Sequence, residues 1–186
     1  MNNINERLDK LRKLVQEDDF LEGKGLSNEV NIRIFCYEPA EEMRIKHFVK
    51  QITTDQSIKS HIVEYDLYRI FLDICADLDI LDGISDMEEC DGSEFTIGEI
   101  QSTVGVNDFI NKIKEYGSLK FGDVMFITGV GDVFPFMRIH LLLEALQPHF
   151  STTPILVMYP GTFDGKYVRL FDKLTPNPYY RAFNVV

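Results

Sequence analysis

The feature that most constrains the fold is an alternation along the chain between short apolar runs and longer segments with helical periodicity. Runs rich in β-branched and aromatic residues, typical of strands, occupy 30–36, 61–66, 123–128, 154–159 and 179–186. Apolar residues recur at helical spacing in the segments between them, at 40–52, 67–80, 107–116 and 135–146. Since strands alternating with helices form sheets covered by helices, we expect a single α/β domain over residues 1–186, layered around a mainly parallel sheet.

An amphipathic helix is expected before the first strand, within residues 1–20. Ile4, Leu8 and Leu11 recur there at helical spacing, and charged residues fill the gaps. The same stretch lacks the apolar core of a signal peptide, and no run in the chain approaches the ~18 apolar residues of a membrane span. Three cysteines at wide spacing, without a CxxC pair, fit a reducing compartment. We therefore expect a cytoplasmic protein without membrane association.

Acidic residues are concentrated in one part of the chain. The 30 Asp and Glu against 19 Lys and Arg give a net charge of −11. No basic residue lies between Arg69 and Lys112, so residues 70–111 form an acidic helical and loop segment that carries the whole excess. Such a segment repels a phosphate backbone, and we expect no direct nucleic-acid binding. Two interpretations stay open: a solvated face, or a docking surface for a basic partner. Its acids are Asp73, Asp77, Asp79, Asp82, Asp86, Glu88, Glu89, Asp91, Glu94, Glu99 and Asp108.

The loop after the first strand, Tyr37–Glu42, is where a nucleotide-binding α/β protein would carry GxxxxGK[ST]. Here it contains no glycine, lysine, serine or threonine, and Pro39 removes one N–H donor. Three carboxylates at the start of the following helix would repel a phosphate. These residues argue against Walker-type ATP hydrolysis.

A second loop, between 129 and 135, carries a G-x-G pair after a buried strand. Gly129 and Gly131 are typical of a tight turn, and Phe134 stands where a dinucleotide fingerprint requires its third glycine. Pro135 suits the first turn of the next helix. Arg138 would then lie in that turn, where a cation opposes the helix dipole unless it pairs with an acid or binds an anion. Asp132 is the candidate acid, and both interpretations remain open.

Nucleophile and metal patterns are absent from the sequence. The four histidines are scattered, no GxSxG elbow occurs, and no His or Cys spacing suggests zinc, so we expect no metal and no cofactor. The segment around Asp164 favours ordinary turn chemistry. Tyr179, Tyr180 and Arg181 are more typical of a closing strand than of a base-stacking platform, which comes with basic surroundings.

Several phrases of the chain, taken together, resemble one family. TGVGDVFPFMRIHLLLEALQ, YPGTFDGKYVRLF, YYRAFNVV and the upstream GLSNEVNIRIFCYEP resemble the BrxB family of bacteriophage-exclusion (BREX) defence systems, over essentially the whole chain. The resemblance implies a process, host defence against phage beside an alkaline-phosphatase-like PglZ protein, a methyltransferase and a large ATPase. It carries over no established catalytic residue. The pattern also resembles a nucleotide-hydrolase core that lacks its phosphate loop.

Two functions remain open at this point. The first is a non-catalytic assembly or adaptor subunit for other BREX proteins, with the PglZ-like protein as the expected partner. The second is a small-molecule or phosphoryl-binding enzyme that uses the Gly129–Asp132 loop and Arg138. A parallel sheet places its sites beyond the carboxyl ends of the strands. The candidate partner-binding or ligand-binding residues there are Gly129, Gly131, Asp132, Phe134, Pro135, Arg138, Tyr159, Pro160, Gly161, Asp164 and Arg181.

Overall fold

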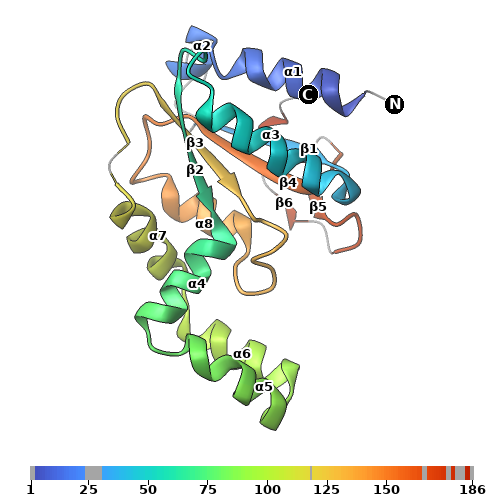
Figure 1. Ribbon diagram of the computed structural model, residues 1–186, viewed down its shortest axis with the longest axis vertical. Coiled ribbons are helices and arrows are strands. Elements are labelled where there is room, and N and C mark those ends of the chain that lie inside the picture. Colours follow the sequence, from blue (N-terminus) through green and yellow to red (C-terminus); the bar gives the residue numbers. More distant parts are fainter. Residues whose placement is uncertain are drawn as a thin grey trace.

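The computed structural model contains one central sheet with helices on both faces (Figure 1). It describes residues 3–23, 31–117, 119–164, 167–174, 177–178 and 183–184. Five strands are parallel and follow the order β2-β3-β4-β1-β7, which confirms the expected α/β fold with a mainly parallel sheet. Their bounds are β1 Ile32–Tyr37, β2 His61–Asp66, β3 Asp123–Thr128, β4 Ile155–Phe163 and β7 Phe183–Asn184. Two further strands are antiparallel: β5 (Tyr167–Leu170) pairs with the end of β4, and β6 (Asn177–Pro178) pairs with β5.

The helices divide between the two faces of the sheet. One face is covered by α1 (Ile4–Leu14) and α3 (Glu42–Thr54), with the short α2 (Asp18–Leu21) beside them. The other is covered by α4 (Leu67–Asp77), α7 (Val106–Glu115) and α8 (Ile139–Leu146). Beyond the end of α4, α5 (Ile84–Asp91) and α6 (Ser93–Thr103) lie away from the sheet (Figure 1). The single turns η1 (Pro39–Glu41) and η2 (Leu81–Gly83) precede α3 and α5.

Strand β3 shows why its sequence forms the centre of the sheet. All six of its residues are buried, as a strand covered on both faces requires. Met125 and Ile127 point to the cluster beneath α4, α7 and α8, while Val124 and Phe126 point to the cluster beneath α1 and α3. This period of two fills both cores from one strand.

The connections bring three loops to one edge of the sheet. From β1 the chain crosses through α3 to the far edge at β2, and it then returns through β3 to β4, which lies beside β1. All four strands are parallel. The carboxyl ends of β1, β3 and β4 therefore meet at the same edge, where open α/β sheets place their ligands.

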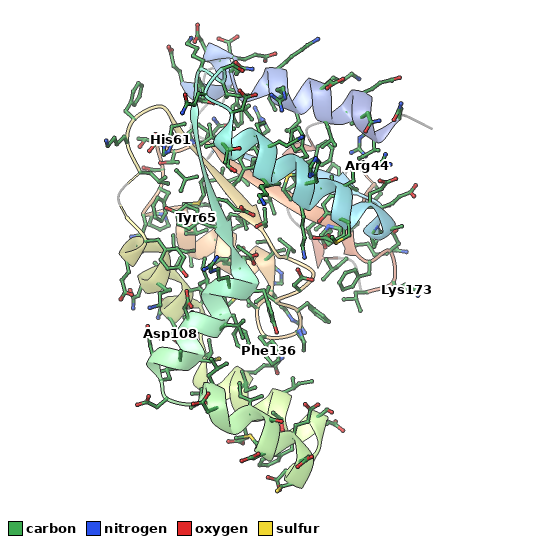
Figure 2. All side chains as sticks on the ribbon, viewed as in Figure 1. Arg44, His61, Tyr65, Asp108, Phe136 and Lys173 are labelled. Carbon is green, nitrogen blue, oxygen red and sulfur yellow. The ribbon has the colours of Figure 1, made fainter. Side chains whose placement is uncertain are left out.

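The expected helix start at Pro135 is wrong. Val130–Phe136 form a series of turns in which the Val133 amide donates to the Gly129 carbonyl (2.9 Å) and the Phe136 amide to the Val133 carbonyl (2.9 Å). Pro135 lies in these turns, after a cis peptide bond. Helix α8 begins at Ile139, so Arg138 is its N-cap residue with extended backbone. The Phe136 ring, at the end of these turns, points toward α4 and stacks on Phe71, with 4.4 Å between the ring centroids (Figure 2).

Strand β4 also differs from its expected end at Pro160-Gly161. It continues to Phe163 because its last residues pair with β5, Gly161 facing Leu170. Gly161 allows this pairing, since a Cβ there would lie 2.1 Å from the Arg169 carbonyl oxygen. A smaller difference concerns the helix expected over 67–80: α4 ends at Asp77, and Leu78, which follows it, is 43% exposed.

Candidate binding site at the carboxyl edge of the sheet

The loop after β3 is attached to helix α3 by an ion pair. The Lys46 ammonium donates to the Asp132 carboxylate at 2.8 Å, across 86 residues of sequence, and lies 3.7 Å from Glu42. On the other side of Glu42, the Tyr37 hydroxyl donates to its carboxylate at 2.6 Å. Asp132 is therefore the partner of Lys46, and of the two interpretations left open for Arg138, the pairing with Asp132 is not formed.

Two members of the polar cluster of Tyr37, Glu42, Lys46 and Asp132 have shifted pKa values, Lys46 and Tyr37. The hydrogen bond to Asp132 raises the pKa of Lys46, so its ammonium stays charged. Burial, followed by the hydrogen bond to Glu42, raises the pKa of Tyr37 far above its ordinary value, so its phenol stays neutral. The cluster therefore joins the loop after β3 to the end of β1 through side chains of α3.

The two glycines of the G-x-G pair have steric reasons to be glycine. Gly129 has a φ of +69°, and a Cβ there would lie 2.5 Å from the Asp66 carboxylate, which caps α4 by accepting from the Tyr68 amide at 3.0 Å. A Cβ on Gly131 would lie 2.9 Å from the ring of Phe171. Both positions are explained by close packing of the turn, the interpretation that the sequence had favoured.

A pocket of about 370 Å³ opens beside this loop, between the start of α8 and the β4–β5 hairpin. We call it the Arg138 pocket. Tyr159 contributes a ring that is 2% exposed, and Arg138 an exposed guanidinium. The remaining walls are apolar. The described lining consists of Val130, Phe134, Met137, Arg138, Ile139, Tyr159, Leu170 and Leu174.

His140 lies one residue into α8 next to this pocket. Its Nδ1 is buried and has no hydrogen-bond partner among the residues that the structure describes. Burial and, second, the positive charge of Arg138 lower the pKa of His140. The imidazole is therefore held neutral at pH 7, as a half-buried histidine rather than a general base in a hydrogen-bonded relay.

The pocket unites some of the residues expected from the sequence and separates others. Phe134, Arg138 and Tyr159 meet in it. Pro160 and Gly161 lie in the β4 ladder, and Asp164 accepts from the Tyr167 amide at 2.7 Å in the β4–β5 turn, as the favoured turn chemistry requires. The Pro135 carbonyl accepts from Gln101 of α6 at 2.8 Å. Arg181 lies outside the described residues.

Five apolar lining residues were missed at the sequence level. They carry no sequence signal for a site, because an apolar residue in a pocket wall looks the same in sequence as one in the core. These residues are Val130, Met137, Ile139, Leu170 and Leu174. The cavity forms where the start of α8 lies beside the β4–β5 hairpin, and no local sequence pattern shows that these two elements meet.

The acidic segment contains a second surface feature, the projecting hairpin of α5 and α6. All six of its carboxylates are exposed, and residues 84–103 contain no Lys, Arg or His. Phe95 is 51% exposed on it, whereas Ile100 is buried at its root. The carboxylates belong to Asp86, Glu88, Glu89, Asp91, Glu94 and Glu99.

Two other kinds of feature were searched for over the described ranges. No helix within them has the length and apolar character to cross a membrane. Over the same ranges, no group of three or more His, Cys, Asp or Glu side chains is arranged to hold a metal ion.

Comparison with known proteins assigns the chain to a family. The model of the BrxB family, described as BREX protein BrxB, matches residues 63–185. A BREX protein BrxB of Bacillus cereus (strain H3081.97) is 33% identical over 100% of this chain and 99% of its own length. A BREX protein BrxB of Escherichia coli O9:H4 (strain HS) is 26% identical over 97% of this chain and 90% of its own. No solved structure matches. The chain belongs to the BrxB family of BREX proteins.

Proposed function

We propose that the chain acts in phage defence as a non-catalytic assembly subunit of a BREX system, in the cytoplasm. Its partner is the PglZ-like BREX protein, which it binds through the projecting hairpin of α5 and α6. Family membership supports the BREX process. The hairpin supports the adaptor role and is the observation that carries it.

The hairpin of α5 and α6 buries little of its own surface within the chain. No residue of α5 is buried, and α6 buries only Thr96 and Ile100. An isolated helix of this length is marginal in water, and most helical stability comes from packing an apolar face. Phe95 is left half-exposed among the carboxylates, and covering it with a partner would contribute about 1 kcal/mol.

The charge on the hairpin defines the chemistry of that partner. Six exposed carboxylates on a segment that contains no Lys, Arg or His raise the rate of encounter with a basic surface and repel acidic ones. A basic surface with an apolar depression for Phe95 would match both features. Tyr159 and Phe134, two of the candidate residues, are not part of this proposed surface, because Tyr159 is 2% exposed and Phe134 is partly buried in the Arg138 pocket.

The enzyme alternative finds less support in the geometry. It requires the Gly129–Asp132 loop to offer free polar groups beside Arg138, yet Asp132 is engaged with Lys46. The glycines are explained by packing. One part of the alternative, a ligand at Arg138, does have a matching pocket.

The test is co-expression with the PglZ-like protein, followed by size-exclusion chromatography and surface-plasmon measurements over a salt series. We expect a complex at micromolar concentration or below. Neutralising four hairpin carboxylates should slow association at low salt and flatten the salt dependence, whereas Phe95→Ala should speed dissociation. The neutralised residues are Asp86→Asn, Glu88→Gln, Glu89→Gln and Asp91→Asn.

A matched control removes the same charge elsewhere. Four exposed acids on the α1–α3 side are replaced by their amides, at Asp9, Glu17, Asp19 and Glu38. This control variant should slow association less than the hairpin variant does, because it leaves the hairpin carboxylates intact. No complex with the PglZ-like protein would refute the adaptor role. Equal effects of the two charge variants would reduce the acidic hairpin to a solubility feature.

A further inference from the structure

We propose that the Arg138 pocket binds a carboxylate carried on a compact apolar group. The apolar group fills the cavity, and the carboxylate accepts hydrogen bonds from Arg138 and Tyr159. The inference is independent of partner binding, because the lining of this pocket contains no residue of α5 or α6.

The walls of the pocket define the apolar part of the ligand. Phe134, Met137 and Ile139 form one wall, and Leu170 and Leu174 the other. The volume of about 370 Å³ lies in the range of small-molecule sites, which are mostly apolar and contain a few placed polar groups. A single aromatic ring or a short branched chain fits such a space.

Tyr159 supplies a buried hydrogen-bond donor. Its side chain is 2% exposed and lines the pocket, and its hydroxyl has no hydrogen-bond partner within the described part of the chain. Burial, reinforced by the negative charge of Asp172, raises the pKa of this phenol, so it remains protonated. An oxygen of the ligand would accept the hydrogen bond that this hydroxyl can donate.

Arg138 supplies the charge. It is exposed at the N-cap of α8 and makes no ion pair with any residue described by the structure, and it is the only charged residue among the described lining. A guanidinium binds a carboxylate through two parallel hydrogen bonds. The N-terminus of α8 adds a partial positive charge of the same sign.

The balance of charge selects a monoanion over a phosphate. One guanidinium neutralises one negative charge. A phosphate monoester carries close to two near pH 7, and Asp172 already places a negative charge near Tyr159. The excess would remain uncompensated in a chain of net charge −11. A carboxylate carries a single negative charge, which the Arg138 guanidinium neutralises without leaving an excess.

The test uses 3-phenylpropanoate as the probe, titrated into the ¹⁵N-labelled protein. We expect saturable chemical-shift changes at Arg138, Ile139 and Leu170. The uncharged 3-phenylpropanamide and the dianion phenyl phosphate should each bind at least roughly ten-fold more weakly. Equal binding of the amide would overturn the proposal, since the carboxylate would then contribute nothing, and so would the absence of saturation.

Variants separate the two polar groups. Arg138→Gln should weaken 3-phenylpropanoate binding by roughly ten-fold or more, and Tyr159→Phe by roughly three- to ten-fold. Arg169→Gln, at an exposed arginine of β5 outside the pocket lining, is the matched control and should change affinity less than about two-fold. Unchanged affinity in Arg138→Gln would overturn the proposal. If a variant fails to fold, the comparison of acid with amide on the unmodified chain still decides.

The same chemistry occurs in a free acid and in the carboxyl terminus of a peptide. A five-residue peptide ending in phenylalanine, with a free or an amidated terminus, distinguishes the two sources. If the free-terminus peptide binds more tightly than 3-phenylpropanoate, the site takes a chain terminus. Weaker binding assigns it to a free acid. If the amidated peptide binds as tightly as the free-terminus peptide, the pocket does not recognise the carboxylate of a chain terminus.

Discussion

Replacing Gly161 by alanine tests the close approach of β5 to β4. The new Cβ would lie 2.1 Å from the Arg169 carbonyl oxygen and 3.1 Å from the Tyr159 ring. The carbonyl belongs to the backbone of β5, so no side-chain rotation relieves the clash. The two strands must separate by about 1 Å to restore van der Waals contact.

The cost combines overpacking with a weakened ladder. Forcing a methyl group into a packed site costs about 1–3 kcal/mol, and loss of one backbone hydrogen bond between β4 and β5 adds about 1 kcal/mol. We therefore expect the free energy of unfolding to fall by about 2–4 kcal/mol. For a chain of 186 residues this corresponds to a fall in Tm of about 4–16 °C.

The measurement is urea unfolding followed by circular dichroism, together with a thermal scan. Gly98→Ala is the matched control, because it adds the same methyl group inside α6, where nothing lies within 4 Å of the new Cβ. Helix propensity predicts that this control gains about 0.5–1 kcal/mol. The reasoning would be refuted if Gly161→Ala unfolded within about 0.5 kcal/mol of the unmodified chain, since β5 could not then approach β4 this closely.

Three further predictions concern pH and ligands. The pKa of His140 is lowered from its ordinary 6.5 in the folded chain, so the unfolded chain takes up a proton first as pH falls. Stability should therefore decline from about pH 7 toward pH 5, and His140→Gln should flatten the decline in urea midpoints across that window. The chain should neither bind nor hydrolyse ATP, since Tyr37–Glu42 lacks phosphate-holding groups; saturable micromolar binding by calorimetry, lost on mutation of that loop, would contradict this. Binding to duplex DNA should be weak at physiological salt, and a nanomolar gel shift would show otherwise.

Local sequence signals predicted the elements of the fold well. The expected strands at 61–66 and 123–128 have those bounds in the structure. The strand at 123–128 is an apolar run bounded by polar residues, and the strand at 61–66 is rich in β-branched and aromatic residues, so a local pattern specifies each. The start of α8 was misplaced because Pro135 is equally suited to a helical first turn and to the turns that the loop makes around Gly129 and Gly131.

The site depended on contacts that no local pattern contains. Lys46 and Asp132 form an ion pair although 86 residues separate them. Sequence analysis could suggest only the nearer Arg138 as a candidate partner of Asp132. Likewise, β4 passes Pro160-Gly161 only because β5 folds back onto it. Sequence reasoning found Phe134, Arg138 and Tyr159 and could not see the cavity that joins them.

The strand order has a consequence for synthesis on the ribosome. Both neighbours of β1, the strands β4 and β7, come from the last third of the chain, although β1 itself is among the first elements to be made. A nascent chain that has reached α8 can pair β2 with β3 but leaves both edges of β1 open. Long-range pairing of this kind is slow, and unpaired apolar edges are prone to aggregate. Translation must therefore pass Phe163 before β1 gains its first neighbour and Asn184 before it gains its second, and a message truncated before β4 would yield a chain in which both edges of β1 are exposed.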